Sequence, residues 1–303
     1  MIIATQLIIG EKIFGRLKTD KRLPEVSMKK RLNTIVVLGS GGMLGSTVAE
    51  YFGRNNYEVI KLDRRTFDVL TDPLLKLEKK IIRADVVINC LGLIKPTIGN
   101  CTPQEALVIN GIFPVNLARV CQRLKIKCFH ITTDCVFSGK KGRYTEHDLV
   151  DAMDLYGLTK AAGDTDLCMT IRTSIIGEES GKSRSLLEWI KSQKDQPVNG
   201  FVNHKWNGVT TLELAKCIEK IISRDWFELG VYHVFSPQIV SKYELLRIVN
   251  EVYGLNLQII KTKAQEAVDR SLSSQKSLTK KLKITPIKDQ VMEMMNFFYP
   301  DEK

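Results

Sequence analysis

The stretch "TIVVLGSGGMLGS" (34–46) constrains the fold more than any other part of this chain. It joins a short β-branched apolar run, typical of a buried parallel strand, to a turn in which Gly39, Gly42 and Gly45 follow a GxxGxxG spacing. Glycine is needed in such a turn for a positive φ, for close approach of a pyrophosphate, and for contact between the next helix and the strand. A helix starting near Met43 would direct its first N–H groups at the phosphates. The pattern predicts a dinucleotide-binding turn.

Strand and helix patterns alternate after this turn. The longest of the expected helices covers residues 105–124. The expected strands cover residues 34–39, 57–63, 85–92, 127–133, 168–177 and, later in the chain, 230–235. Continuous apolar strands that alternate with helices are typical of a doubly wound parallel sheet, so we predict an α/β Rossmann fold.

The pattern changes after Gly177. Helical periodicity dominates there, at 183–193 and 241–254, with few strand signals. We therefore expect a smaller C-terminal lobe that binds the substrate. The predicted division is an N-terminal extension at 1–33, a dinucleotide-binding core at 34–176 completed by the strand at 230–235, and a substrate-binding lobe made of 177–229 and 236–303.

The end of the second expected strand bears on the choice of cofactor. Asp63 lies where a carboxylate could hold an adenosine ribose hydroxyl, which favours NADH. Arg64 and Arg65 follow at once, and guanidinium groups at this place suit a 2′-phosphate. We predict NADPH as the cofactor, with NADH as an alternative.

A tyrosine and a lysine lie four residues apart in "YGLTK" (156–160). Reduction of a carbonyl by hydride needs an acid, and tyrosine can serve if its pKa falls from about 10 toward neutrality. The ammonium group of Lys160, one helical turn from Tyr156, would lower that pKa. Thr133 ends an expected strand at the carboxyl edge of the sheet, where its hydroxyl could hold the substrate carbonyl. Chance placement on a helix and a plain helix cap are the alternatives, and the glycine turn favours the catalytic interpretation.

Composition and charge exclude other classes of protein. No apolar run reaches the roughly 18 to 20 residues that span a bilayer, and "MIIATQLIIG" (1–10) lacks the flanks of a secretory signal. The net charge of +11 is concentrated in 1–33 and 260–291, each with eight Lys/Arg against three acids, which argues against a nucleic-acid surface. Seven scattered cysteines without CxxC, and four histidines without ligand spacing, predict no metal site and a cytoplasmic protein.

Six motifs together resemble the extended short-chain dehydrogenase/reductases. In order they are "GSGGMLGS", "NCLG", "VINGIFPVNLA", "ITTDCVFSGKKGRYTEHD", "YGLTKAAGD" and "IRTSIIG". The resemblance covers roughly residues 34 to 275 and is strongest to dTDP-4-dehydrorhamnose reductase and its nucleotide-sugar relatives.

The resemblance implies a set of site residues. Thr133, Tyr156 and Lys160 would be catalytic, and the last two would also contact the cofactor. The other cofactor-binding candidates are Gly39, Gly42, Met43, Leu44, Gly45, Asp63, Arg64, Asn89, Leu91 and Gly92. Asn110 would support the lysine, and Arg270 would lie near the nucleotide diphosphate. Phe137, Trp206 and Arg270 are candidates for the substrate cleft, although each also fits the core or the surface.

Departures from the family pattern narrow the reaction. Sugar-nucleotide dehydratases carry Asp-Glu after the threonine, whereas this chain has Asp134-Cys135, and a cysteine cannot replace the carboxylate that elimination needs. The reductases more often have tyrosine at position 135, and their late Pro-Thr is "GVTT" (208–211) here, so the sugar stays open. The expected function is reduction of the 4-keto group of a nucleotide-linked 4-keto-6-deoxyhexose, dTDP-4-dehydrorhamnose to dTDP-L-rhamnose, for cell-surface polysaccharide. If the protein assembles, we expect a homodimer.

Two alternatives stay open. One is a non-catalytic NADP-binding regulatory subunit that resembles the beta subunit of methionine adenosyltransferase, although a binding module has no need of a proton donor. The other is a nucleotide-sugar epimerase or epimerase-reductase, which would need an additional acid/base pair.

Overall fold

The structure is a computed structural model that describes residues 33–179 and 185–301. These residues belong to one compact unit, Leu32–Lys303. The N-terminal extension expected at 1–33 lies outside the described residues, apart from Asn33.

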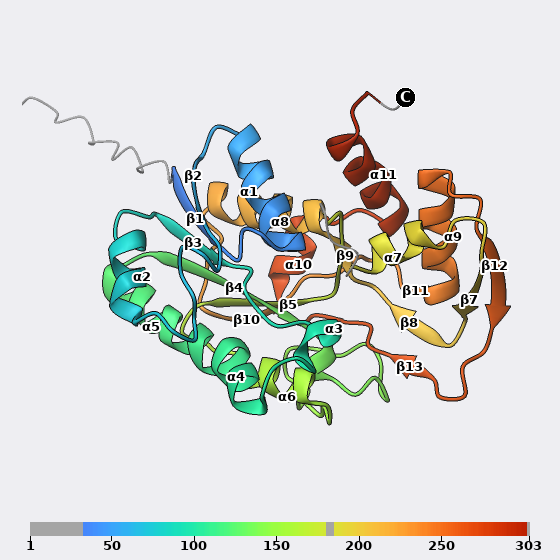
Figure 1. Ribbon diagram of the computed structural model, residues 1–303, viewed down its shortest axis with the longest axis horizontal. Coiled ribbons are helices and arrows are strands. Elements are labelled where there is room, and N and C mark those ends of the chain that lie inside the picture. The colour runs from blue at the N-terminus through green and yellow to red at the C-terminus, as the bar shows by residue number, and fades with distance from the viewer. Residues whose placement is uncertain (1–32, 180–184, 302–303) are drawn as a thin grey trace, which may run out of the picture. The chain divides into compact units, whose positions relative to one another are not determined.

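A six-stranded parallel sheet lies at the centre of this unit, in the order β10-β5-β4-β3-β1-β2 (Figure 1). Its strands are β1 (Thr34–Leu38), β2 (Glu58–Leu62), β3 (Val86–Asn89), β4 (Lys127–Thr133), β5 (Met169–Thr173) and β10 (Gly230–His233). The chain passes from β1 to β2 on one side and then to β3 on the other, so the strand order reverses beside β1. Ligands of doubly wound sheets bind at such a reversal. The architecture confirms the predicted Rossmann fold.

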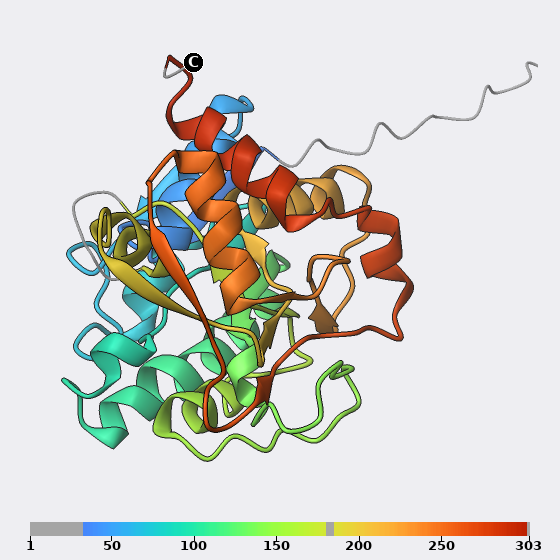
Figure 2. The same cartoon turned by 90° about the vertical axis from the view of Figure 1, so that its right-hand side faces the viewer.

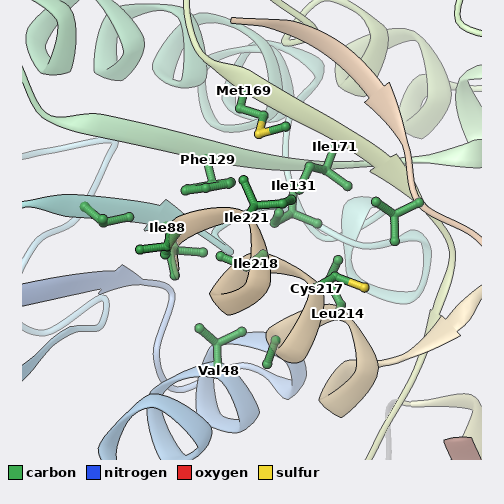
Figure 3. Packing of buried hydrophobic residues seen from close by; sticks show 14 of the residues in the cluster. Val48, Ile88, Phe129, Ile131, Met169, Ile171, Leu214, Cys217, Ile218 and Ile221 are labelled. Carbon is green, nitrogen blue, oxygen red and sulfur yellow. The ribbon is translucent and has the colours of Figure 1, made fainter. Parts of the chain in front are cut away.

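Helices cover both faces of the sheet, which explains why its strands are apolar throughout. The helices on one face are α1 (Met43–Arg54), α8 (Thr211–Ser223) and α10 (Ser277–Leu282), and those on the other include α2 (Leu74–Ile81) and α5 (Phe113–Leu124) (Figure 1). Successive side chains of β1 alternate between the two faces: Ile35 packs toward α1 and α8, whereas Val36 packs toward α2 and α5. Figure 3 shows Ile218 and Ile221 of α8 between the sheet and Val48 of α1.

The single helix expected at 105–124 is interrupted, and this corrects the prediction. The segment consists of α4 (Pro103–Leu107), a π-helical turn η1 (Val108–Ile112) and α5. Pro114 has no N–H to donate to the carbonyl of Asn110 four residues earlier, and its ring crowds that carbonyl, so regular α-helix is disfavoured there. The π turn moves Asn110 toward the end of α6 (Leu155–Ala161), where a Cβ on Gly163 would lie 2.1 Å from the Asn110 carbonyl oxygen.

A separate hydrophobic cluster forms the C-terminal lobe, seen from its own side in Figure 2. Its helices are α7 (Leu186–Ser192), α9 (Lys242–Tyr253) and α11 (Ile287–Phe298). The expectation of few strands is wrong, because the lobe contains the small sheets β11-β8-β13, β12-β7 and β6-β9. Their strands are β6 (Ile175–Ile176), β7 (Pro197–Phe201), β8 (His204–Trp206), β9 (Val209–Thr210), β11 (Val240–Ser241), β12 (Gln258–Thr262) and β13 (Val268–Asp269). Each is only two to five residues long, so it carries little periodicity. The substrate-binding role of the lobe stays a prediction.

Candidate active site

Two adjoining hollows open at the carboxyl edge of the sheet, with volumes of about 490 and 940 Å³. Gly42, Arg64, Leu91 and Gly92 line both, so the hollows form one continuous cleft. Among the predicted site residues, the first hollow also has Gly39 and Asp63, and the second has Met43, Leu44, Thr133, Tyr156 and Lys160. The cleft therefore brings the expected phosphate turn and the expected catalytic residues together. Each hollow by itself is in the size range of small-molecule sites.

The glycine turn is shaped by backbone contacts that leave no room for side chains. Gly39 has φ +74°, and a Cβ there would lie 3.0 Å from the backbone of Leu91. Gly45 does not line the cleft, but a Cβ on it would lie 2.2 Å from the carbonyl oxygen of Gly39. Gly42 caps α1 and lines the cleft. Because it has no side chain to accept hydrogen bonds from the first N–H groups of the helix, this end of α1 is open to the cleft, as a pyrophosphate site requires. The turn fits a dinucleotide.

The charged residues that follow β2 form two ion pairs: Asp63 with Arg65, and Arg64 with Asp68. Arg65 donates to Asp63 Oδ2 through Nε at 3.0 Å and Nη2 at 2.8 Å, and these hydrogen bonds are the main reason that the Asp63 pKa is lowered. Arg64 donates to Asp68 Oδ2 at 2.8 Å. Both arginines are largely exposed in the first hollow. Because Arg65 neutralises Asp63, this end of the cleft does not repel a 2′-phosphate.

Asn89 does not line the cleft, which corrects its assignment to the adenosine side. Its side chain is fully buried, with Nδ2 at 3.1 Å from His130 Nδ1. Its Oδ1 accepts a hydrogen bond from the backbone N–H of Leu91 at 3.1 Å. Asn89 therefore shapes the turn after β3, and Leu91 and Gly92 line the cleft.

The start of α6 places Tyr156 and Lys160 one turn apart at the cleft. Asp154 caps this helix by accepting a hydrogen bond from the N–H of Gly157 at 2.7 Å. The Lys160 ammonium group is buried and donates to the carbonyl oxygen of Ile131 on β4 at 3.1 Å. The same strand ends at Thr133, so Thr133 and Lys160 reach the cleft from adjacent elements.

The Thr133 hydroxyl lies between three groups. It is 3.1 Å from Asp134 Oδ1 and accepts a hydrogen bond from the N–H of Cys135, also at 3.1 Å. It also hydrogen-bonds Tyr156, which lowers the pKa of that phenol. Thr133 therefore connects the tyrosine to the short 3₁₀ turn η2 (Asp134–Val136).

The pKa of Tyr156 differs from the expectation that it falls toward neutrality. Burial raises it well above its ordinary range, and the neighbouring Cys135 raises it further. Burial also lowers the pKa of Lys160, to about 8, which weakens the lysine's effect on the phenol. Tyr156 therefore keeps its proton at neutral pH, which is the form needed for donation to a carbonyl oxygen.

Asn110 supports the site through its neighbours. Its Oδ1 accepts a hydrogen bond from the N–H of Leu93 at 2.8 Å, and its Nδ2 donates to the Thr159 hydroxyl at 3.2 Å. The residue thus ties the loop after β3 to α6 next to Lys160. The Lys160 ammonium group itself donates its hydrogen bond to the carbonyl oxygen of Ile131, so the support from Asn110 is indirect.

Two of the three proposed substrate-cleft residues are buried behind the cleft. Phe137 is 0% exposed and stacks on Tyr144 with ring centroids 4.2 Å apart, so its prediction as a cleft residue is wrong. Trp206 is 4% exposed and donates to the Ser174 hydroxyl, which does line the cleft, at 2.7 Å. Arg270 is half-buried and donates to the Phe137 carbonyl oxygen at 2.8 Å.

Sequence reasoning missed a group of charges at the substrate end. Lys242 begins α9 and lies 5.5 Å from the Trp206 ring. Burial raises the pKa of Asp134, whereas Arg270 and, less strongly, Lys242 lower it. Lys95 donates to Asp154 at 2.8 Å and also lines the cleft. No local motif marks Lys242, because its electrostatic effect on Asp134 acts between residues more than a hundred positions apart.

No group of three or more His, Cys, Asp or Glu side chains that could hold a metal ion occurs in residues 33–179 and 185–301. In the same residues no helix is both long and apolar enough to cross a bilayer.

The parallel sheet, the glycine turn at its reversal point and the cleft shared by Thr133, Tyr156 and Lys160 define a Rossmann-fold protein of the short-chain dehydrogenase/reductase kind. A family model described as the RmlD substrate binding domain matches residues 33–297. The chain belongs to this family, and the match extends over both the sheet and the C-terminal lobe.

Curated relatives and solved structures agree with this assignment. The chain is 27% identical over 244 residues to the spore coat polysaccharide biosynthesis protein SpsK of Bacillus subtilis, covering 78% of this chain and 84% of that protein. It is 24% identical over 274 residues to dTDP-4-dehydrorhamnose reductase of Mycolicibacterium smegmatis, covering 84% and 82%. The structure of dTDP-4-dehydrorhamnose reductase from Bacillus anthracis in complex with NADP superposes with a TM-score of 0.76 at 20% identity, covering 89% of this chain and 100% of that one. The last similarity establishes the shared fold.

Proposed function

We propose that the protein is an NADPH-dependent reductase of the 4-keto group of a nucleotide-linked 4-keto-6-deoxyhexose, with dTDP-4-dehydrorhamnose as substrate and dTDP-L-rhamnose as product. The observation that carries the proposal is that Thr133, Tyr156 and Lys160 line one cleft that continues into the glycine turn. The names of the relatives, which include several sugar-nucleotide reductases, support the substrate class. We also propose that the protein is cytoplasmic, that it can use NADH as well, and that it forms a homodimer.

Each residue has a chemical role in this reaction. The reduced nicotinamide, when bound, supplies the hydride that is added to C4 of the sugar. Tyr156 donates its phenolic proton to the carbonyl oxygen, which its raised pKa permits because the proton is present at neutral pH. Thr133, already in hydrogen-bond contact with Tyr156, would hold the same oxygen. Lys160 would orient the nicotinamide ribose and compensate the charge that Tyr156 acquires.

The side chains at the end of β4 favour reduction over elimination. Cys135 lines the cleft, and burial raises the pKa of its thiol to about 12, with Asp134 adding to the rise. A thiol that keeps its proton cannot take up the proton that dehydration removes. The complete set of Thr133, Tyr156 and Lys160 also argues against a binding-only regulatory subunit.

Turnover with a defined substrate tests the function. The protein is mixed with NADPH and freshly prepared dTDP-4-keto-6-deoxy-L-mannose, and loss of the reduced-nicotinamide absorbance is followed while the product is identified by NMR. We expect stoichiometric NADPH oxidation and dTDP-L-rhamnose. If NADPH binds but neither this sugar nor a panel of UDP- and GDP-linked keto-sugars is reduced, the proposal is wrong.

Arg65 is expected to control the choice between the two cofactors. Arg65→Ala removes a cation from the first hollow and releases the Asp63 carboxylate, which would repel a 2′-phosphate and accept a ribose hydroxyl. We expect the Kd for NADPH to rise at least about tenfold, the size of one lost charged hydrogen bond, and the Kd for NADH to stay the same or fall. Fluorescence titration with both cofactors measures this. Arg83→Ala, at an exposed arginine outside the cleft, is the matched control, and equal weakening of both cofactors would contradict the assignment.

A further inference from the structure

A buried ion pair lies behind the active-site lysine. Arg172 on β5 donates Nε to Asp164 Oδ2 at 2.6 Å, and the two side chains are only 8% and 7% exposed. Within the described chain, Arg172 Nη1 has no hydrogen-bond partner, whereas the Thr132 side chain lies beside the Asp164 carboxylate and lowers its pKa. Removing two charges from water is costly, and apolar residues of the same volume often give equal or greater stability. An incompletely bonded buried pair is therefore better explained by a role in the site than by stability.

We propose that Asp164, fixed by Arg172, is a positioning residue that keeps Lys160 charged and directed at the cleft. The inference rests on the proposed function, in which Lys160 acts beside Tyr156. It assigns a role to the residue four positions after Lys160, beyond the end of the helix.

The ion pair and the lysine come from different elements but meet neighbouring residues of β4. Lys160 donates to the carbonyl oxygen of Ile131, and the next residue, Thr132, lies opposite Arg172 in the β4–β5 register. The chain turns back after α6, because Gly163 N donates to Lys160 O at 3.1 Å and Asp164 N donates to Ala161 O at 3.2 Å. Gly163 in turn fits closely against the π turn, where a Cβ would collide with Asn110. These contacts fix the main chain of Asp164 just beyond the end of α6, about one helical turn after Lys160.

Titratable groups from three parts of the chain surround Lys160. Burial lowers the pKa of Lys160 to about 8, and the Asp164 carboxylate opposes this more than any other group, followed by Cys90 after β3. Burial raises the pKa of the Cys90 thiol far above neutrality, and burial lowers that of His130 on β4, so both are neutral. Burial raises the pKa of Asp164, and the ion pair with Arg172 opposes that rise and favours the ionised carboxylate. Asp164 is therefore the negative charge on which the ammonium form of Lys160 depends.

Removing the carboxylate is expected to make Lys160 lose its proton at lower pH. In the full chain with ¹³Cε-labelled lysine, the Lys160 resonance, assigned by its absence from Lys160→Arg, should titrate near pH 8 in the unmodified protein. In Asp164→Asn it should titrate lower by about one pH unit, a tenfold change in the protonation equilibrium. The ratio of kcat at pH 8.5 to kcat at pH 6.5 should fall severalfold, whereas kcat at pH 6.5 changes less. A purely structural role would lower kcat equally at both pH values.

Further variants distinguish the loss of the carboxylate from misfolding of the protein. Asp164→Asn combined with Arg172→Met removes both charges of the ion pair, so Arg172 is not left unpaired, and it should show the same shift of Lys160 because Arg172 is not among the charges that act on the lysine. Asp164→Glu should restore the titration, and Asp166→Asn, at an exposed carboxylate two residues on, should not alter it. Unchanged titration of Lys160 in both Asp164→Asn proteins would overturn the inference. A shifted titration in a protein that reduces no keto-sugar would uphold the electrostatic role of Asp164 and refute the proposed function instead.

Discussion

Tyr156→Phe is expected to lower kcat by about 10³-fold, within the range that a general acid contributes, while the Kd for NADPH changes less than about twofold. The reason is local: the phenol is the protonated group in hydrogen-bond contact with Thr133 at the cleft. Phenylalanine retains the ring and its packing, so the cofactor site is kept. Single-turnover kinetics with saturating NADPH separates loss of chemistry from loss of binding.

The control for this variant is Tyr243→Phe, because Tyr243 lies on α9 outside the residues that line the cleft. It should leave kcat within about twofold of the original value. Substantial turnover by Tyr156→Phe would mean that another group supplies the proton. Thr133 would then be the next residue to replace.

Gly45→Ala is expected to abolish tight binding of the dinucleotide. The added Cβ would lie 2.2 Å from the carbonyl oxygen of Gly39, a backbone atom, so α1 and the turn cannot keep their present separation. We expect the Kd for NADPH to rise at least about a hundredfold and stability to fall by about 1–3 kcal/mol, as for other overpacked sites. Isothermal titration and urea unfolding measure the two effects.

The same helix provides a matched substitution. Gly53 lies in α1 with nothing within 4 Å of an added Cβ, so Gly53→Ala should bind NADPH normally and gain up to about 1 kcal/mol from helix propensity. Normal NADPH affinity in Gly45→Ala would show that the turn does not hold the pyrophosphate.

The fold could be predicted because its signals are local. The run of apolar residues in β1, the glycines after it and the alternation with helices each occur within a few neighbouring positions. The set of Thr133, Tyr156 and Lys160 could be predicted for the same reason, since strand ends and helix turns fix where such residues lie. The π turn could also have been suspected from Pro114 inside an otherwise helical pattern.

Other features depend on contacts between distant segments. Lys242 affects the Asp134 carboxylate electrostatically across more than a hundred residues. Asp164 and Arg172 are only eight residues apart, but their ion pair forms because the chain turns back from α6 into β5. Burial, which no short window reveals, turns Phe137 into a core residue and raises the pKa of Tyr156 instead of lowering it. The short strands of the C-terminal lobe were missed because their pairing partners are remote in sequence.

The end of β4 has a consequence for protein engineering. Ile131 accepts the hydrogen bond of Lys160, Thr132 lies opposite Arg172, and Thr133 contacts Tyr156, so three successive residues set the distances of the reacting groups. A strand advances about 3.3 Å per residue and tolerates little change in that step. A transplant of the segment 131–164 into another parallel sheet would therefore have to include Arg172 and Asn110, while the residues across the cleft are varied separately to accept a different sugar.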